Sequence, residues 1–147
     1  MPRDTDALPL VYSCSGCSSA AQLANHLALR LDRDGTAEMS CIAGVGGQVP
    51  SLVRTAQHAA RTGRPILALD GCVLACVRQS LAQHGIHPTV HMQLGAHGVR
   101  KVYHADFDAA QADSLYDEIK QRTVAMSLLG KQPAAGCGGG ACRCSGA

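Results

Sequence analysis

The chain has 147 residues, a formal net charge of +2 and 16% charged residues, which predicts one domain with its own core and argues against a nucleic-acid-binding surface. Aromatic residues make up 3% and tryptophan is absent, so a base-stacking surface is not indicated either. The polar start and the absence of a run of ~20 apolar residues predict a cytoplasmic protein without a signal peptide or a membrane span.

Four short apolar runs predict strands, and each is followed by a segment in which apolar residues recur at helical spacing. The predicted strands span residues 8–13, 37–41, 65–70 and 89–94. The predicted helices span residues 19–33, 50–62, 72–84 and 108–130. Ser19 with Gln22 and Asp108 with Gln111 fit capping boxes at two helix starts. Residues 44–47, Gly-Val-Gly-Gly, predict a flexible turn.

This alternation predicts a single α/β domain over residues 8–130, in which helices cover both faces of a four-stranded, mainly parallel sheet. The expected architecture is three-layered and doubly wound, of the flavodoxin or Rossmann type. We expect the flavodoxin-like strand order 2-1-3-4, which makes the first and third strands neighbours at the switch point. Residues 131–147 are rich in Gly, Ala and Cys, which predicts a disordered C-terminal tail.

The chain contains eight cysteines, and a reducing cytosol disfavours a disulfide framework. Cys14 and Cys17 follow the first predicted strand, Cys41 follows the second and Cys72 follows the third. Because the carboxyl ends of parallel strands share one edge, we expect these turns to meet. Four thiolates suit a tetrahedral zinc ion or another soft metal. The spacing therefore predicts a thiolate metal site, used in metal sensing, storage or delivery, made of Cys14, Cys17, Cys41 and Cys72.

The same placement supports a second hypothesis, which is thiol redox chemistry or persulfide transfer by the Cys14-x-x-Cys17 pair and Cys72. Helix starts stabilise thiolate over thiol, which favours both metal binding and nucleophilic attack. A Cys-x-x-Cys between a strand and a helix is also the thioredoxin placement, although the regular strand–helix alternation argues against a thioredoxin-like fold. Enzymatic activity stays open, since three ligands and an open position make a reactive zinc.

Further cysteines are candidate auxiliary ligands. The third predicted helix places Val73 and Cys76 on its inner face, so Cys76 is expected to be a nearby sulfur or a buried core residue, with burial favoured. Asp70 is expected to accept a hydrogen bond from its own turn or to orient a ligand. In the tail, either a flexible arm captures soft metals for the edge site or the thiols have no specific role. The tail cysteines are Cys137, Cys142 and Cys144.

Three motifs resemble those of the DGC-domain family, which is named for its Asp-Gly-Cys sequence. They are Cys14-Ser15-Gly16-Cys17, Ser40-Cys41-Ile42-Ala43-Gly44 and Asp70-Gly71-Cys72. The resemblance covers about residues 8–130 and implies a small bacterial protein, described as zinc-binding because of four chelating cysteines, with no established biological role. The implied partner is a metal ion, and nothing in the sequence requires a homodimer. By this resemblance the metal role falls on Cys14, Cys17, Cys41 and Cys72.

Overall fold

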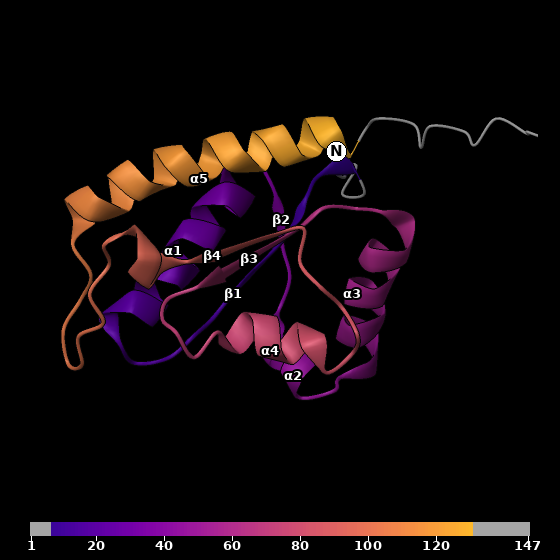
Figure 1. Ribbon diagram of the computed structural model, residues 1–147, viewed down its shortest axis with the longest axis horizontal. Coiled ribbons are helices and arrows are strands. Elements are labelled where there is room, and N and C mark those ends of the chain that lie inside the picture. The colour runs from indigo at the N-terminus through magenta and orange to yellow at the C-terminus, as the bar shows by residue number, and fades with distance from the viewer. Residues whose placement is uncertain (1–6, 131–147) are drawn as a thin grey trace, which may run out of the picture.

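Four parallel strands form the sheet in the computed structural model, which describes residues 7–130 (Figure 1). The strands are β1 (Leu10–Ser13), β2 (Glu38–Met39), β3 (Ile66–Asp70) and β4 (Val90–Gln93). Their order, β2-β1-β3-β4, confirms the predicted flavodoxin-like arrangement. The parallel direction of every strand also argues against the thioredoxin-like alternative, because those folds contain antiparallel strands.

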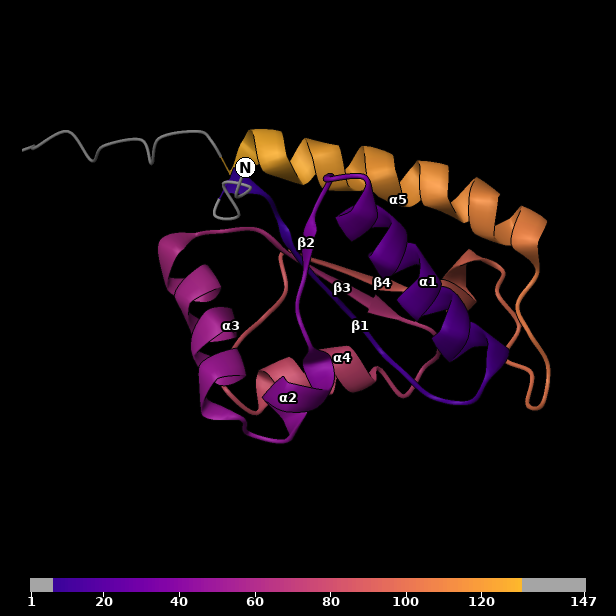
Figure 2. The same ribbon diagram turned by 180° about the vertical axis from the view of Figure 1, so that it is seen from behind.

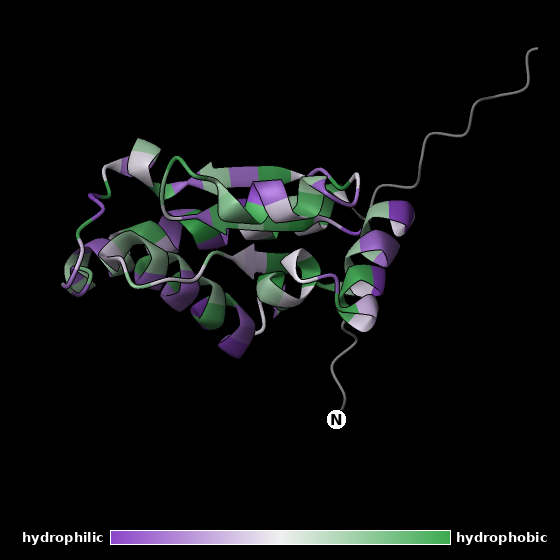
Figure 3. Ribbon diagram, turned by 90° about the horizontal axis from the view of Figure 1, so that it is seen from below, coloured by the Kyte–Doolittle hydropathy of each residue, from purple (hydrophilic) through white to green (hydrophobic). Residues whose placement is uncertain are grey.

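Helices cover both faces of the sheet, which confirms the three-layer α/β architecture (Figures 1 and 2). The helices on one face are α1 (Ser19–Arg33) and α5 (Ala109–Leu129). The helices on the other face are α2 (Ile42–Gly46), α3 (Pro50–Thr62) and α4 (Cys76–Ala82). A short 3-10 turn, η2 (Leu94–His97), follows β4. Apolar and polar residues alternate along the helices in Figure 3, as expected for helices with one buried and one exposed side.

The two central strands, β1 and β3, are buried along their whole length. They pair residue by residue up to Ser13 and Leu69. Beyond that pair, the backbone N–H of Cys14 still donates to the carbonyl of Leu69 at 3.0 Å. Cys14 and Asp70 therefore leave the sheet side by side, and the turns that follow begin in contact.

The start of α1 differs from the predicted capping box. Ser18, one residue before the predicted Ser19, is the N-cap, and its hydroxyl accepts the backbone N–H three residues later at 3.2 Å. The hydroxyl of Ser19 instead accepts the N–H of Val102 at 3.0 Å, which ties α1 to the loop before α5. One half of the predicted capping box of α5 is confirmed, because the Asp108 carboxylate accepts the N–H of Gln111 at 2.7 Å. The Gln111 side chain donates instead to the carbonyl of Gly98 at 3.2 Å.

The predicted flexible turn over residues 44–47 is wrong, since α2 occupies most of it. Gly44 is buried, and the side chain of Leu52 in α3 fills the position that a Cβ at Gly44 would need. The missing side chain therefore lets the short helix pack closely against α3. Glycine usually signals a break in a helix, and here a tertiary contact outweighs that tendency.

The third predicted helix begins four residues later than expected, at Cys76 rather than Cys72. Ala75 adopts the left-handed conformation, with φ 51° and ψ 48°, which interrupts a right-handed helix. As a result Val73 is 84% exposed and Cys76 is also exposed. The inward placement predicted for these two side chains is therefore wrong, and the cause is a cap on α4 supplied by Asp70 from the end of β3.

Within residues 7–130, no helix is both long enough and apolar enough to cross a bilayer. The tail predicted over residues 131–147 lies outside the described residues. The same holds for its three candidate auxiliary ligands, which are Cys137, Cys142 and Cys144.

Candidate cysteine site at the carboxyl edge of the sheet

Turns at one edge of the sheet carry all four cysteines of the predicted ligand set. Cys14 directly follows β1, and Cys17 lies in the same turn before α1. Cys41 lies between β2 and α2, and Cys72 lies between β3 and α4. Because β2, β1 and β3 are parallel neighbours, their carboxyl ends share this edge. The topology therefore brings together turns that are far apart along the chain.

The closest contact between two of these turns joins Cys14 to Gly71. Cys14 is 6% exposed, and its Sγ accepts the backbone N–H of Gly71 at 3.2 Å. A Cβ on Gly71 would lie 2.5 Å from the backbone oxygen of Ala20, in the first turn of α1. Only glycine fits this approach, which gives a physical reason for the glycine in the Asp-Gly-Cys motif.

The environment of Cys14 favours the neutral thiol. Burial raises the pKa of this thiol above its usual value, and the N–H of Gly71 acts in the opposite direction. Negative charge on Asp70, Cys76 and Cys72 raises the pKa further. These three groups are therefore close enough to act on the Cys14 sulfur. The structure brings Cys14, Cys72 and Cys76 into one electrostatic neighbourhood.

Asp70 is a buried carboxylate that organises the turn after β3. It is 1% exposed and accepts the N–H of Val77 at 2.8 Å and of Arg78 at 3.3 Å. It also forms a hydrogen bond with Nε2 of His91, from β4, at 2.8 Å. Asp70 therefore caps α4 and links it to the sheet, whereas the sequence predicted a hydrogen bond within its own turn. The contact between Asp70 and His91 carried no signal in the sequence.

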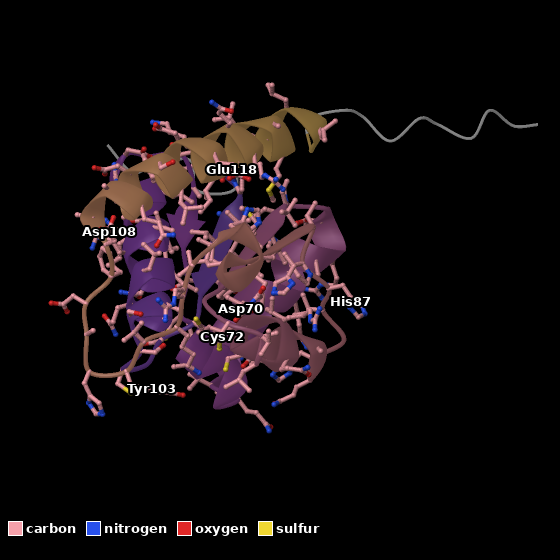
Figure 4. The ribbon with its side chains drawn as sticks, turned by 60° about the vertical axis from the view of Figure 1, so that its left-hand side comes forward. Asp70, Cys72, His87, Tyr103, Asp108 and Glu118 are labelled. Atoms are coloured by element: carbon pink, nitrogen blue, oxygen red, sulfur yellow. The ribbon has the colours of Figure 1, made fainter. Side chains whose placement is uncertain are left out.

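Cys72, which is labelled in Figure 4, is half-buried, and its sulfur contacts a lysine from a distant loop. The Nζ of Lys101 donates a hydrogen bond to the Cys72 Sγ at 3.6 Å. A hydrogen bond with Tyr103 is the main cause that raises the pKa of Lys101, and the negative charge of Cys72 raises it as well. Lys101 carried no signal in the sequence, because it lies in a loop 29 positions from Cys72.

Cys17 and Cys41 are exposed and stand apart from the Cys14 neighbourhood. Cys41 lines a cleft of about 410 Å³ together with Ser13, Ser15 and Asn25. Burial raises the pKa of the Tyr12 phenol, and negative charge on Cys41 raises it further. Cys41 therefore lines an open cleft that also contains apolar side chains, and it acts electrostatically on a buried phenol.

The described side chains do not form a complete metal site. Among residues 7–130, no three side chains of His, Cys, Asp or Glu stand close enough to hold one ion. Cys72 and Cys76 influence the Cys14 thiol electrostatically, while Cys17 and Cys41 are exposed at the same edge. The donor set is all sulfur, which suits a thiophilic ion, so the ligand set stays a prediction with suitable chemistry.

The chain is similar to known proteins over most of its described length. A family model described as the DGC domain matches residues 10–119, which include all four predicted ligands. The chain is also 60% identical over 116 residues to the anaerobic and virulence modulator AnvM of Pseudomonas aeruginosa, and the match covers 79% of this chain and 86% of that protein. No solved structure matches the chain.

Proposed function

The chain belongs to the DGC-domain family, and we propose that it binds zinc or another soft metal through thiolates at the carboxyl edge of its sheet. The observation that carries this proposal is that the turns after three neighbouring parallel strands place Cys14, Cys17, Cys41 and Cys72 at one edge of the sheet, where the Cys14 sulfur bonds to the N–H of Gly71 at 3.2 Å. Four sulfurs are the number that a structural zinc ion prefers. The name of the relative AnvM describes a modulator, which favours metal sensing over storage or delivery.

The proposed ligands are Cys14, Cys17, Cys41 and Cys72, with Cys76 as an auxiliary donor. When bound, the ion would supply a positive charge that holds these turns together. Binding requires the exposed Cys17 and Cys41 side chains to approach the other sulfurs, because no three donors stand together in the described residues. It also requires loss of the Cys14 proton, which burial retains. Metal binding would therefore both rearrange the edge and release a proton, and a sensor uses such changes.

The test is the metal content of the full chain, purified anaerobically. We expect about one zinc per chain with protected thiols, as a four-sulfur site would give. Cys72→Ser should lower the content, because Cys72 is half-buried at the edge. His58→Ala is the matched control, since this exposed potential ligand lies beside Pro65 at the opposite end of β3. Equal metal content in all three proteins would remove Cys72 from the ligand set.

Thiol exchange is the second candidate function. Burial of Cys14 and its neutral state weaken the original form of this hypothesis, in which Cys14 and Cys17 act as an exposed redox pair. The contact between Lys101 and Cys72 favours a different reactive sulfur. Anaerobically purified chain without metal, but with a disulfide that reductants open, would favour thiol exchange over metal binding.

A further inference from the structure

Two loops that adjoin Cys72 carry exposed apolar side chains. In the turn after β3, Val73 is 84% and Leu74 is 63% exposed. In the loop before α5, Val102 is 41% and Tyr103 is 59% exposed. These are half of the eight large apolar side chains that are exposed among residues 7–130, and Lys101 joins the two loops through its contact with Cys72. We call these four apolar residues the Cys72 rim.

The fold holds the loop of Lys101 in place beside Cys72. Ser19 at the start of α1 fixes the loop from both sides, because its backbone N–H donates to the Val102 carbonyl at 2.9 Å and its hydroxyl accepts the Val102 N–H at 3.0 Å. The loop therefore presents the preceding residue, Lys101, toward Cys72. The ammonium also lies 5.3 Å from the centre of the Tyr103 ring, a favourable cation–π distance.

The other described cysteines lack this combination. Cys14 is buried and its sulfur is occupied by the N–H of Gly71. Cys17, Cys41 and Cys76 are exposed, and no cation contacts their sulfurs among residues 7–130. Among the described cysteines, Cys72 alone combines partial exposure with an ammonium donor at its sulfur and exposed apolar residues in the adjoining loops.

We propose that Cys72 is a modification site for small aromatic or alkyl disulfides, with Lys101 as its positioning residue. This inference goes beyond metal binding and needs no metal. The rim contains four apolar side chains, which suits a small molecule, whereas a stable protein interface needs about 20–30 residues from each side. The apolar walls favour an apolar or aromatic group on the disulfide, and the ammonium stabilises negative charge on the attacking sulfur.

The step is a thiol–disulfide exchange with RSSR as the co-reactant. The Cys72 thiolate attacks one sulfur of RSSR, and a bond forms between the two sulfurs. The S–S bond of RSSR breaks, and its other half leaves as the thiolate RS⁻. The Cys72 sulfur is oxidised while the departing sulfur is reduced, so the electrons balance without a further oxidant.

The first experiment finds which thiol reacts first. The full chain is stripped of metal with a chelator, reduced and kept anaerobic, and less than one equivalent of dithiodipyridine is added. Peptide mapping by mass spectrometry then identifies the labelled cysteine. We expect Cys72 to carry most of the first label, including in comparison with the three tail cysteines. A first label mainly on any other cysteine overturns the proposal.

The second experiment tests whether Lys101 acts on the Cys72 sulfur or only attracts a negatively charged probe. Dithiodipyridine is uncharged at neutral pH, whereas dithiobis-nitrobenzoate is a dianion. Lys101→Met should slow labelling of Cys72 by about fivefold with both probes, and Lys101→Arg should restore most of the rate. Arg100→Met is the matched control, because this neighbouring exposed cation has no side-chain contact with Cys72, and it should leave the rate unchanged.

Each further outcome decides a part of the inference. Slowing of the dianion alone would mean that Lys101 merely attracts the probe, which overturns its positioning role. Leu74→Asn should reduce the preference for dithiodipyridine over hydroxyethyl disulfide, and an unchanged preference overturns the role of the rim. Metal content is measured separately, so failure of this inference leaves the metal proposal standing, and the reverse also holds.

Discussion

The turns after β1 and β3 begin side by side but place their cysteines in opposite environments. Cys14 is buried, and its sulfur accepts a backbone N–H. Cys72 is half-buried among exposed apolar side chains, and its sulfur meets an ammonium group. The two positions follow paired strands, so strand-end placement alone does not determine the chemistry of a thiol. The difference comes from which distant segments pack against each turn.

The largest loss of stability is expected when Asp70, which anchors the turn after β3, is replaced. Asp70→Asn should cost about 3 kcal/mol of unfolding free energy, because it replaces a buried carboxylate that is hydrogen-bonded to the N–H of Val77 and to His91. Urea denaturation measures this. Asp113→Asn is the control, since Asp113 forms an exposed pair with Arg30 and should cost at most about 1 kcal/mol. Equal losses in both variants would contradict the anchoring role.

The second largest loss is expected from a substitution that forces the turns after β1 and β3 apart. Gly71→Ala should cost about 2 kcal/mol, because a Cβ there would lie 2.5 Å from the backbone oxygen of Ala20 and force the turns apart. Labelling of Cys14 should accelerate in the same variant as its sulfur becomes accessible. Gly16→Ala is the control, because its Cβ would meet only the Cβ of Ala21 at 3.6 Å. Slow labelling of Cys14 in a destabilised Gly71→Ala variant would argue that Gly71 does not protect this sulfur.

A pH effect sharpens the contrast between the two thiols. Burial raises the pKa of Cys14 in the folded chain above its ordinary value of 9.0. The stability from this bound proton is complete below that value and is lost as pH rises through the folded pKa. The metal-free chain should therefore lose up to about 1.4 kcal/mol per pH unit from this group above its ordinary pKa.

Urea denaturation in mildly and strongly alkaline buffer measures this loss. Cys14→Ala should make the decline of stability with pH shallower. A remaining decline is expected from Tyr12, because burial raises the pKa of its phenol as well. An unchanged pH dependence in Cys14→Ala would show that Cys14 does not hold its proton in the folded chain.

The smallest effect concerns Lys101. Lys101→Met should change unfolding free energy by less than about 0.5 kcal/mol, because the side chain is exposed and outside the core. Thermal denaturation of the metal-free chain measures this. A loss comparable with that of Asp70→Asn would make the contact between Lys101 and Cys72 structural, and its effect on labelling would then need another explanation.

The sequence was sufficient for the framework and insufficient for the surroundings of each cysteine. Hydrophobic runs and helical spacing predicted the alternation of strands and helices. The strand order and the shared edge of the cysteine turns followed from the general rules for doubly wound sheets. Three motifs predicted the family before the comparisons confirmed it. The start of α4 was missed, because Asp70 caps this helix from seven residues away. The exposed position of Cys76 follows from that shift.

By itself the amino-acid sequence determined the parallel sheet and the placement of Cys14, Cys41 and Cys72 after its strands. These features depend on the local periodicity of apolar residues and on turns that follow each strand within a few residues. Only the tertiary structure decided that Cys14 is buried against Gly71 and that Lys101 reaches Cys72. Solvent exposure and charge at a sulfur depend on segments that are distant in the chain and close in space, and no local pattern records those contacts.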